Sequence, residues 1–234
     1  AATGVAQRCS ASCRAMLRTS AVVALFAVAA CQAPRSPREL PEGHGRGVVE
    51  ADPAPPTGAT TFAAPAWRIG DRFTLQRGDD ARASFEVVGM LPDAYLIDGG
   101  AGPGGFQLRR GLDLSYQGEF LPNGEPLHVL SPADVRYHWP LWVGKRWQCE
   151  FVDRTIGGPA MPVEVAYFVE ALETISVPAG TFEALRIVRH ERRRTSQGPS
   201  RLRTQLTWYA PTIGSEVRQL VDGELFELVA VERP

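Results

Sequence analysis

The sequence predicts a mainly β protein built on a single antiparallel curved sheet, either a half-barrel or barrel-like. Three observations favour this fold class. From Trp67 onward, short runs alternate between apolar and polar residues, clusters of Gly, Pro, Asn and Asp separate these runs, and no segment keeps a helical period. The length of 234 residues and the 44% hydrophobic content suit one substantial core or two small ones.

The N-terminal part has the layout of a secretory signal. From Met16 the chain reads MLRTSAVVALFAVAAC, in which Arg18 precedes an apolar run over residues 21–30. This run is shorter than the roughly twenty residues that a membrane-spanning helix needs. We expect residues 1–15 to be a non-native upstream extension and residues 16–30 to be a signal peptide that is removed.

The end of this signal, Val28-Ala29-Ala30-Cys31, resembles a bacterial lipobox. The resemblance implies that Cys31 carries lipid such as palmitate, becomes the new N-terminus and makes the membrane a partner. An ordinary secretory signal with an incidental cysteine is the alternative. Gln32 stands where related lipoproteins retained in the inner membrane carry aspartate, so we expect the outer membrane, facing the periplasm.

A flexible tether is predicted between the lipid and the folded domain. Residues 31–65 begin with Cys31, are rich in Pro, Gly and Ala and show no apolar periodicity. Such a composition buries too little apolar surface to offset the entropy of ordering. His44, between two glycines, is interpreted as a solvated linker residue. The antiparallel β-domain is expected to span 66–234.

The strands of this domain are predicted from runs of alternating apolar residues bounded by turn residues. Turns are expected at Gly78-Asp79-Asp80, Asn123-Gly124, Gly157-Gly158-Pro159 and Asp222-Gly223. The predicted strands are 67–76, 83–90, 94–98, 105–110, 113–116, 145–153, 162–177, 181–194, 202–209, 215–221 and 225–232.

A sequence similarity between two segments of the chain suggests two quasi-repeats. The stretches WRIGDRFTL (67–75) and LWVGKRWQC (141–149) align at a constant offset. Their alternate positions are apolar, which predicts an inward face for Trp67, Ile69, Phe73 and Leu75 and for Leu141, Val143, Trp147 and Cys149. Cys149 is therefore expected to be a buried structural thiol. A chance coincidence of short β motifs is the alternative.

A hairpin is predicted where SVPAGTFEALRI (176–187) sets a proline and a glycine between two strand-forming runs. The segments VPAGTFEALRI and WYAPTIG (208–214) resemble a poorly characterised family of secreted bacterial β-proteins and lipoproteins. The resemblance implies an antiparallel curved sheet similar to the half-barrel of periplasmic lipoprotein carriers. It implies no catalytic residues.

Composition and motifs exclude several function classes. The net charge of −1 disfavours general nucleic-acid binding. G-x-S-x-G, H-E-x-x-H and S-x-x-K motifs are absent, and His44, His128, His138 and His190 are widely separated. The glycine-rich stretch 98–105 is interpreted as a hairpin loop rather than a phosphate site. We therefore expect no cofactor, no metal and no enzymatic activity.

An arginine cluster, RHERRRTSQGPSRLR (189–203), is predicted to lie on a hairpin. Arg192, Arg193 and Arg194 could contact anionic lipid or an acidic partner; the alternative is a solvated hairpin tip that charge keeps from pairing with other edges. Trp142, opposite in parity to Trp147, could line a groove for sugar or lipid.

Three functions remain open. The first is a non-catalytic binding or interaction module of the cell envelope, with a lipid or an envelope protein as partner. The second is a carrier of an apolar ligand, such as a lipid, in the curved sheet. The third, an enzyme, is the least supported, because no nucleophile stands beside a base. A void on the inward face would favour the carrier, and a filled face the interaction module.

Overall fold

A computed structural model describes residues 41–78, 81–99, 105–195 and 198–234. The predicted upstream extension (1–15), the signal peptide (16–30), Cys31 and the first part of the tether lie outside the described residues. Within these ranges the secondary structure is all β, as the sequence predicts. No helix of the described part of the chain is long and apolar enough to cross a membrane.

Fourteen strands are present in the described ranges, and every pair of neighbours is antiparallel. They are β1 (Gly47–Ala51), β2 (Arg72–Arg77), β3 (Ala81–Met90), β4 (Ala94–Asp98), β5 (Gln107–Gly111), β6 (Tyr116–Phe120), β7 (Pro126–Asp134), β8 (Arg146–Thr155), β9 (Met161–Val177), β10 (Gly180–Thr195), β11 (Gly198–Pro199), β12 (Arg203–Ala210), β13 (Ser215–Val221) and β14 (Glu224–Glu232).

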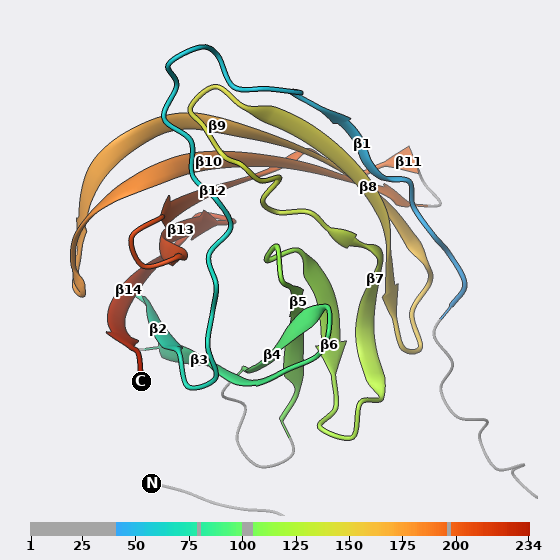
Figure 1. Cartoon of the computed structure of the whole chain (residues 1–234). Coiled ribbons are helices and arrows are strands. Elements are labelled where there is room, and N and C mark those ends of the chain that lie inside the picture. Colours follow the sequence, from blue (N-terminus) through green and yellow to red (C-terminus); the bar gives the residue numbers. More distant parts are fainter. Residues whose placement is uncertain (1–40, 79–80, 100–104, 196–197) are drawn as a thin grey trace, which may run out of the picture. The chain divides into compact units, whose positions relative to one another are not determined.

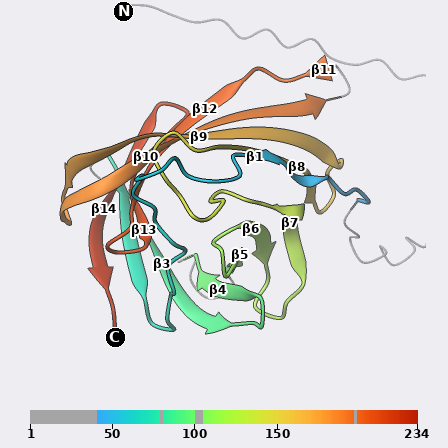
Figure 2. The same ribbon diagram turned by 45° about the horizontal axis from the view of Figure 1, so that its top comes forward.

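The sheet closes into a barrel. Hydrogen bonding runs in the order β8, β7, β6, β5, β4, β3, β2, β14, β13, β12 and β10, and β9 joins β10 back to β8 (Figure 1). Twelve strands therefore form a ring, and the two short strands β1 and β11 pair with the ends of β8 and β10 (Figure 2). The observed form is the barrel-like alternative of the prediction rather than the half-barrel.

Strand β9 shows how the sequence pattern sets the inward face. Val163, Val165, Tyr167 and Val169 alternate along the strand and are all buried, as expected for one face of a pleated strand. The chain reverses after Val177 and returns as β10. The predicted hairpin at VPAGTF is thereby confirmed, and Gly180 adopts the positive φ (136°) that the turn requires.

The predicted flexible tether is wrong for part of its length. Residues 47–51 form β1, which pairs with β8 from Gly47 opposite Glu150 to Ala51 opposite Trp147. The backbone N–H and C=O groups of β1 form hydrogen bonds with β8 instead of with water. The composition of this segment predicts disorder, but pairing with a distant strand orders it. Arg46 adds an ion pair with Glu150. The ordered region thus begins well before residue 66.

The segment after β1 then crosses the barrel to reach β2 (Figure 1). Phe62 forms an antiparallel bridge with Leu141, and the indole Nε1–H of Trp67 donates to the carbonyl oxygen of Gly214 at 2.8 Å. A Cβ on Gly214 would lie 2.6 Å from Pro65, so the segment packs closely against this turn. The segment therefore covers one end of the barrel.

The similar segments 67–75 and 141–149 each contain the same kind of turn. Gly70 and Gly144 each have positive φ, and each donates its N–H to a neighbouring strand, to Val87 and Val169 at 2.8 Å. Trp67, Phe73, Leu75, Leu141, Trp147 and Cys149 are buried as predicted. Ile69 and Val143 are not, with 58% and 45% of their surface exposed. They lie in the turns before the strands begin, where alternation does not apply.

Strand β7 was not among the predicted strands, and it contains Pro126 and Pro132. Proline cannot donate to a sheet and argues against a central strand. The structure accommodates both prolines: Pro126 is the first residue, and Pro132 lies just beyond Ser131, where the pairing of β7 with β8 ends. Beyond this point β8 pairs with β1 instead of β7.

Candidate amphipathic cavity

One half of the barrel interior is filled. Trp147 and Tyr167 stack with ring centres 4.9 Å apart, and Tyr137 and Tyr209 pack with centres at 5.1 Å. Cys149 lies in the same core and is 1% exposed, which confirms the predicted buried thiol. Burial raises the pKa of Cys149, with the Asp134 carboxylate adding to the shift, so its reactive thiolate is disfavoured.

The other half contains a cavity of about 240 Å³. Its apolar wall comes from β2, β3, β4, β5 and β14 together with Trp67: the residues are Trp67, Phe73, Leu75, Ala83, Phe85, Val87, Ile97, Leu108 and Phe226. Ala83 is exposed although it lines the cavity, so the cavity opens beside it. The inward face of these strands therefore carries a void beside the filled core.

The rest of the cavity lining is polar. It presents Arg110, Tyr116, Arg136, Ser215, Glu216 and Gln219, from β5, β6, β13 and the segment after β7. Arg110 donates to a Glu216 carboxylate oxygen at 3.2 Å, and the Tyr137 hydroxyl donates to the same oxygen at 2.7 Å. Burial alone would raise the pKa of Glu216, but Arg110 and Tyr137 outweigh it and hold that pKa below its ordinary value.

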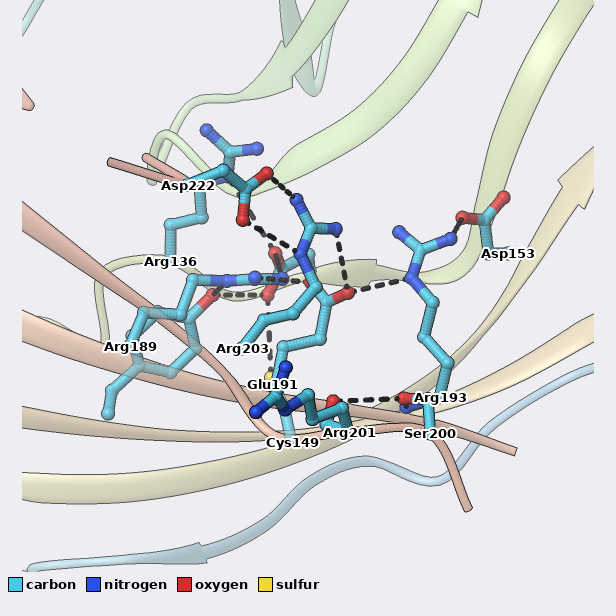
Figure 3. A network of polar contacts seen from close by, with 12 residues as sticks. Arg136, Cys149, Asp153, Arg189, Glu191, Arg193, Ser200, Arg201, Arg203 and Asp222 are labelled. Carbon is cyan, nitrogen blue, oxygen red and sulfur yellow. Dashed lines mark hydrogen bonds and ion pairs between the residues drawn. The ribbon is translucent and has the colours of Figure 1, made fainter. Parts of the chain in front are cut away.

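An ion-paired network connects β7, β8 and β10 (Figure 3). Asp134, at the end of β7, accepts from the Tyr167 hydroxyl at 2.6 Å, from Arg189 Nη2 at 3.1 Å and from the Cys149 thiol at 3.6 Å. Arg189 also pairs with Glu191 two residues along β10. Both acids are almost fully buried, so these partners replace the water that each carboxylate has lost.

Two further arginines continue the network from Glu191. Arg193 Nε donates to Glu191 at 2.7 Å, and its Nη1 donates to Asp153 at 3.0 Å. Arg203 lies 3.5 Å from Glu191 and pairs with Asp222 (Figure 3). Burial would raise the pKa of Glu191, but its arginine partners lower it below the ordinary value. Each carboxylate of the network therefore has at least one arginine partner.

At the edge of the network, His128 Nε2 lies 2.8 Å from Asp153. The hydrogen bond to Asp153 raises the pKa of His128, and burial opposes this effect only in part. Burial would raise the pKa of Asp153, yet His128 and Arg193 lower it. The two pKa shifts are opposite in direction and each favours the ionised form, which indicates a charged pair at mildly acidic pH.

The predicted anionic-contact hairpin is divided by the strand alternation of β10. Arg193 points inward into the network, whereas Arg192 is exposed and Arg194 pairs with Glu164 at 2.6 Å. The three arginines therefore do not form one patch, and sequence reasoning missed their inward partners. The sequence did contain a sign of these partners. Glu191 lies two residues from both Arg189 and Arg193, and the two-residue period of a strand places all three side chains on one face.

Other predicted features take different places. Trp142, expected to line a groove, is buried at 3% exposure, and Lys145 Nζ lies 4.2 Å from its ring centre. Asp134, Glu191 and Glu216 are among the buried acids that sequence reasoning missed, because they have partners on distant strands. In the described part of the chain, no group of three or more His, Cys, Asp or Glu side chains is placed to hold a metal ion.

The fold and the cavity define a closed, twelve-stranded antiparallel β-barrel protein with an amphipathic interior. The chain matches no protein-family model and no curated protein. Among solved structures it is similar to the hypothetical lipoprotein YmcC of Escherichia coli, with a TM-score of 0.44 and 9% identity over 70% of this chain and 85% of that one.

Two further structures are similar. A protein of Bacteroides fragilis described as having a YmcC-like fold gives a TM-score of 0.39 and 14% identity over 74% of this chain and all (100%) of that one. A protein of Parabacteroides distasonis, described there as a lipoprotein candidate, gives 0.40 and 12% over 74% and 99%. These likenesses concern the backbone arrangement and assign no ligand or activity.

Proposed function

We propose that this protein is a non-catalytic binding protein of the cell envelope that holds a small apolar molecule inside its barrel. The observation that carries the proposal is the cavity, which is lined by apolar side chains of β2 to β5 and β14 and by a smaller group of polar side chains. A concave, mainly apolar site with a few convergent polar groups is the usual form of a small-molecule site.

The size of the cavity limits the ligand. Its volume of about 240 Å³ lies just below the roughly 300–1,000 Å³ typical of sites for drug-sized ligands. A single short chain or one ring system fits this volume better than a lipid with several acyl chains. This size favours the carrier over the interaction module, whose open concave face the closed barrel does not provide.

A non-catalytic role agrees with the groups that line the cavity. Ser215 is there, but no histidine lines the described cavity wall beside it. Glu216 is held by Arg110 and Tyr137, and the thiol of Cys149 is buried with a raised pKa. A nucleophile with an adjacent free base is the usual requirement for covalent catalysis, and these groups do not supply one.

Blocking the cavity mouth tests the proposal. The replacement Ala83→Trp puts a large ring where the cavity opens, while Val88→Trp adds the same ring at an exposed position of the same strand. We expect Ala83→Trp to weaken binding of the neutral fluorescent probe phenylnaphthylamine about tenfold or more, and Val88→Trp to leave it unchanged. Equal binding by both variants would contradict an internal site.

The membrane anchor is proposed from the sequence of residues 16–31. Acylation of Cys31 would hold the chain at the membrane, and Gln32 favours the outer membrane over the inner one. Cells fed labelled palmitate should incorporate the label into the protein, and Cys31→Ser should abolish this incorporation and release the chain from the membrane fraction. Undiminished label in Cys31→Ser would rule out this anchor.

A further inference from the structure

Arg136 differs from the other arginines of the barrel interior. Arg110, Arg189, Arg193 and Arg203 each donate at least one side-chain hydrogen bond to a carboxylate. The side chain of Arg136 makes no hydrogen bond with any residue in the described ranges, and its Nε is buried without a partner. This Nε has no accessible surface and lies near Asp134, but the two terminal nitrogens of the guanidinium also make no hydrogen bond with the described residues, so they can donate to a group that enters the cavity.

The acid nearest to Arg136 is already engaged. The Nε of Arg136 lies 3.7 Å from an Asp134 oxygen, which is beyond hydrogen-bonding distance. That oxygen accepts from Arg189, and the other Asp134 oxygen accepts from Tyr167 and Cys149. Asp134 therefore leaves the hydrogen-bonding capacity of Arg136 unused.

The position of Arg136 directs this capacity into the cavity. Its guanidinium carbon lies 4.8 Å from the ring centre of Tyr116, which also lines the cavity, so the two side chains make a cation–π contact there. Arg136, Glu216 and Gln219 also line a second, smaller cavity of about 30 Å³, so they lie at the border between the two spaces. The Gln219 amide has no side-chain hydrogen bond in the described part of the chain and faces the same border.

We propose that Arg136, with Gln219 beside it, binds the carboxylate of a small apolar monocarboxylic acid whose apolar body occupies the cavity. The charges around the site are compatible with an anion: Arg110 pairs with Glu216, and Asp134, the acid nearest to Arg136, is shared with Arg189. The planar guanidinium matches the geometry of a carboxylate. This inference rests on the proposed binding function and specifies its ligand class.

Octanoate and octanol test this assignment, because they share an apolar chain and differ in charge. Binding is measured by titration calorimetry on the full chain carrying Cys31→Ser, purified without detergent. A hydrogen-bonded charge should make octanoate bind about tenfold to a hundredfold more tightly than octanol. Arg136→Gln should reduce the affinity for octanoate to that for octanol and leave octanol unchanged, while Arg136→Lys should retain part of the preference.

The control is Arg192→Gln, which removes an exposed arginine from β10 and should change neither affinity. Chain length gives a second reading: affinity should rise about fourfold per added methylene until the cavity is full, then stop rising. If octanoate and octanol bind equally well, or if Arg136→Gln weakens both equally, the carboxylate assignment is overturned while the cavity stands. If neither they nor phenylnaphthylamine binds, the proposed function fails as well.

Discussion

The hydroxyl of Tyr167 donates to the carboxylate of Asp134 across 2.6 Å, and Arg189 Nε donates to that same hydroxyl at 3.0 Å. Three strands, β7, β9 and β10, meet at this point, and the carboxylate is almost fully buried. Because a buried carboxylate without donors is costly, this relationship ties strand pairing to the charge balance of the interior.

The first prediction concerns this hydroxyl. Tyr167→Phe removes one donor from Asp134 and one acceptor from Arg189, which should lower the free energy of unfolding by about 1–3 kcal/mol. Tyr209→Phe is the control, because Tyr209 is equally buried but makes no hydroxyl hydrogen bond with the described residues. Urea denaturation of both variants measures the difference. Equal losses would show that the hydroxyl of Tyr167 does not stabilise the network.

The second prediction is a pH dependence with two limbs. The folded-state pKa values of Glu191, Asp153 and Glu216 are lowered. The contribution of these acids to the free energy of unfolding is therefore complete above about pH 4.3 and is lost as the pH falls through the lowered values. The pKa of His128 is raised, so its contribution is complete below about pH 6.5 and is lost as the pH rises through its folded value.

The free energy of unfolding should therefore be greatest between about pH 5 and 6. His128→Asn should flatten the limb above this range and leave the acidic limb in place. Urea denaturation across the pH range measures both limbs. A limb above pH 6 that survives in His128→Asn would assign it to another group.

The third prediction concerns the attachment of β1. A Cβ on Gly45 would lie 2.4 Å from the backbone of Glu150 and of Phe151, so Gly45→Ala should displace β1 from β8. Hydrogen exchange of the β8 amides over 147–150 should then become faster. Gly158→Ala, where the new methyl would meet only ordinary contacts at 3.5 Å, is the control. Unchanged exchange in Gly45→Ala would mean that β1 pairs with β8 by another route.

The fourth prediction concerns Cys149. Because its thiol is buried and its pKa is raised, alkylation of Cys149 at neutral pH should be slow in the folded protein and fast in denaturant. Mass spectrometry of the peptide that contains Cys149 distinguishes it from the other cysteines. Rapid alkylation of the native chain would contradict the buried position.

The sequence was sufficient for features set by local patterns. The alternation in β9, the reversal at Pro178 and the burial of Cys149 follow from residue types and spacing alone. Strand β1 was not predictable, because a Val-Val pair among Gly, Pro and Ala becomes a strand only through β8, about a hundred residues later. Ring closure likewise depends on which strands pair, which local patterns do not encode.

The candidate site was even harder to predict from the sequence. Arg189 lies 55 residues from Asp134, and Arg110 lies 106 residues from Glu216, so no spacing rule links the partners. The arginine run looked like a single charged surface because its acidic partners come from β7, β8 and the turn after β13. A strand period applied to Glu191 would have placed part of that run inside the barrel.

Native mass spectrometry of the full chain, purified from its host envelope without adding ligand, tests the central claim most directly. The account predicts a bound species whose mass corresponds to one small, mainly apolar molecule, and predicts that Ala83→Trp loses this species while Val88→Trp keeps it. A chain that carries no such species and also fails to bind octanoate, octanol or phenylnaphthylamine would contradict the claim that the barrel is a binding site.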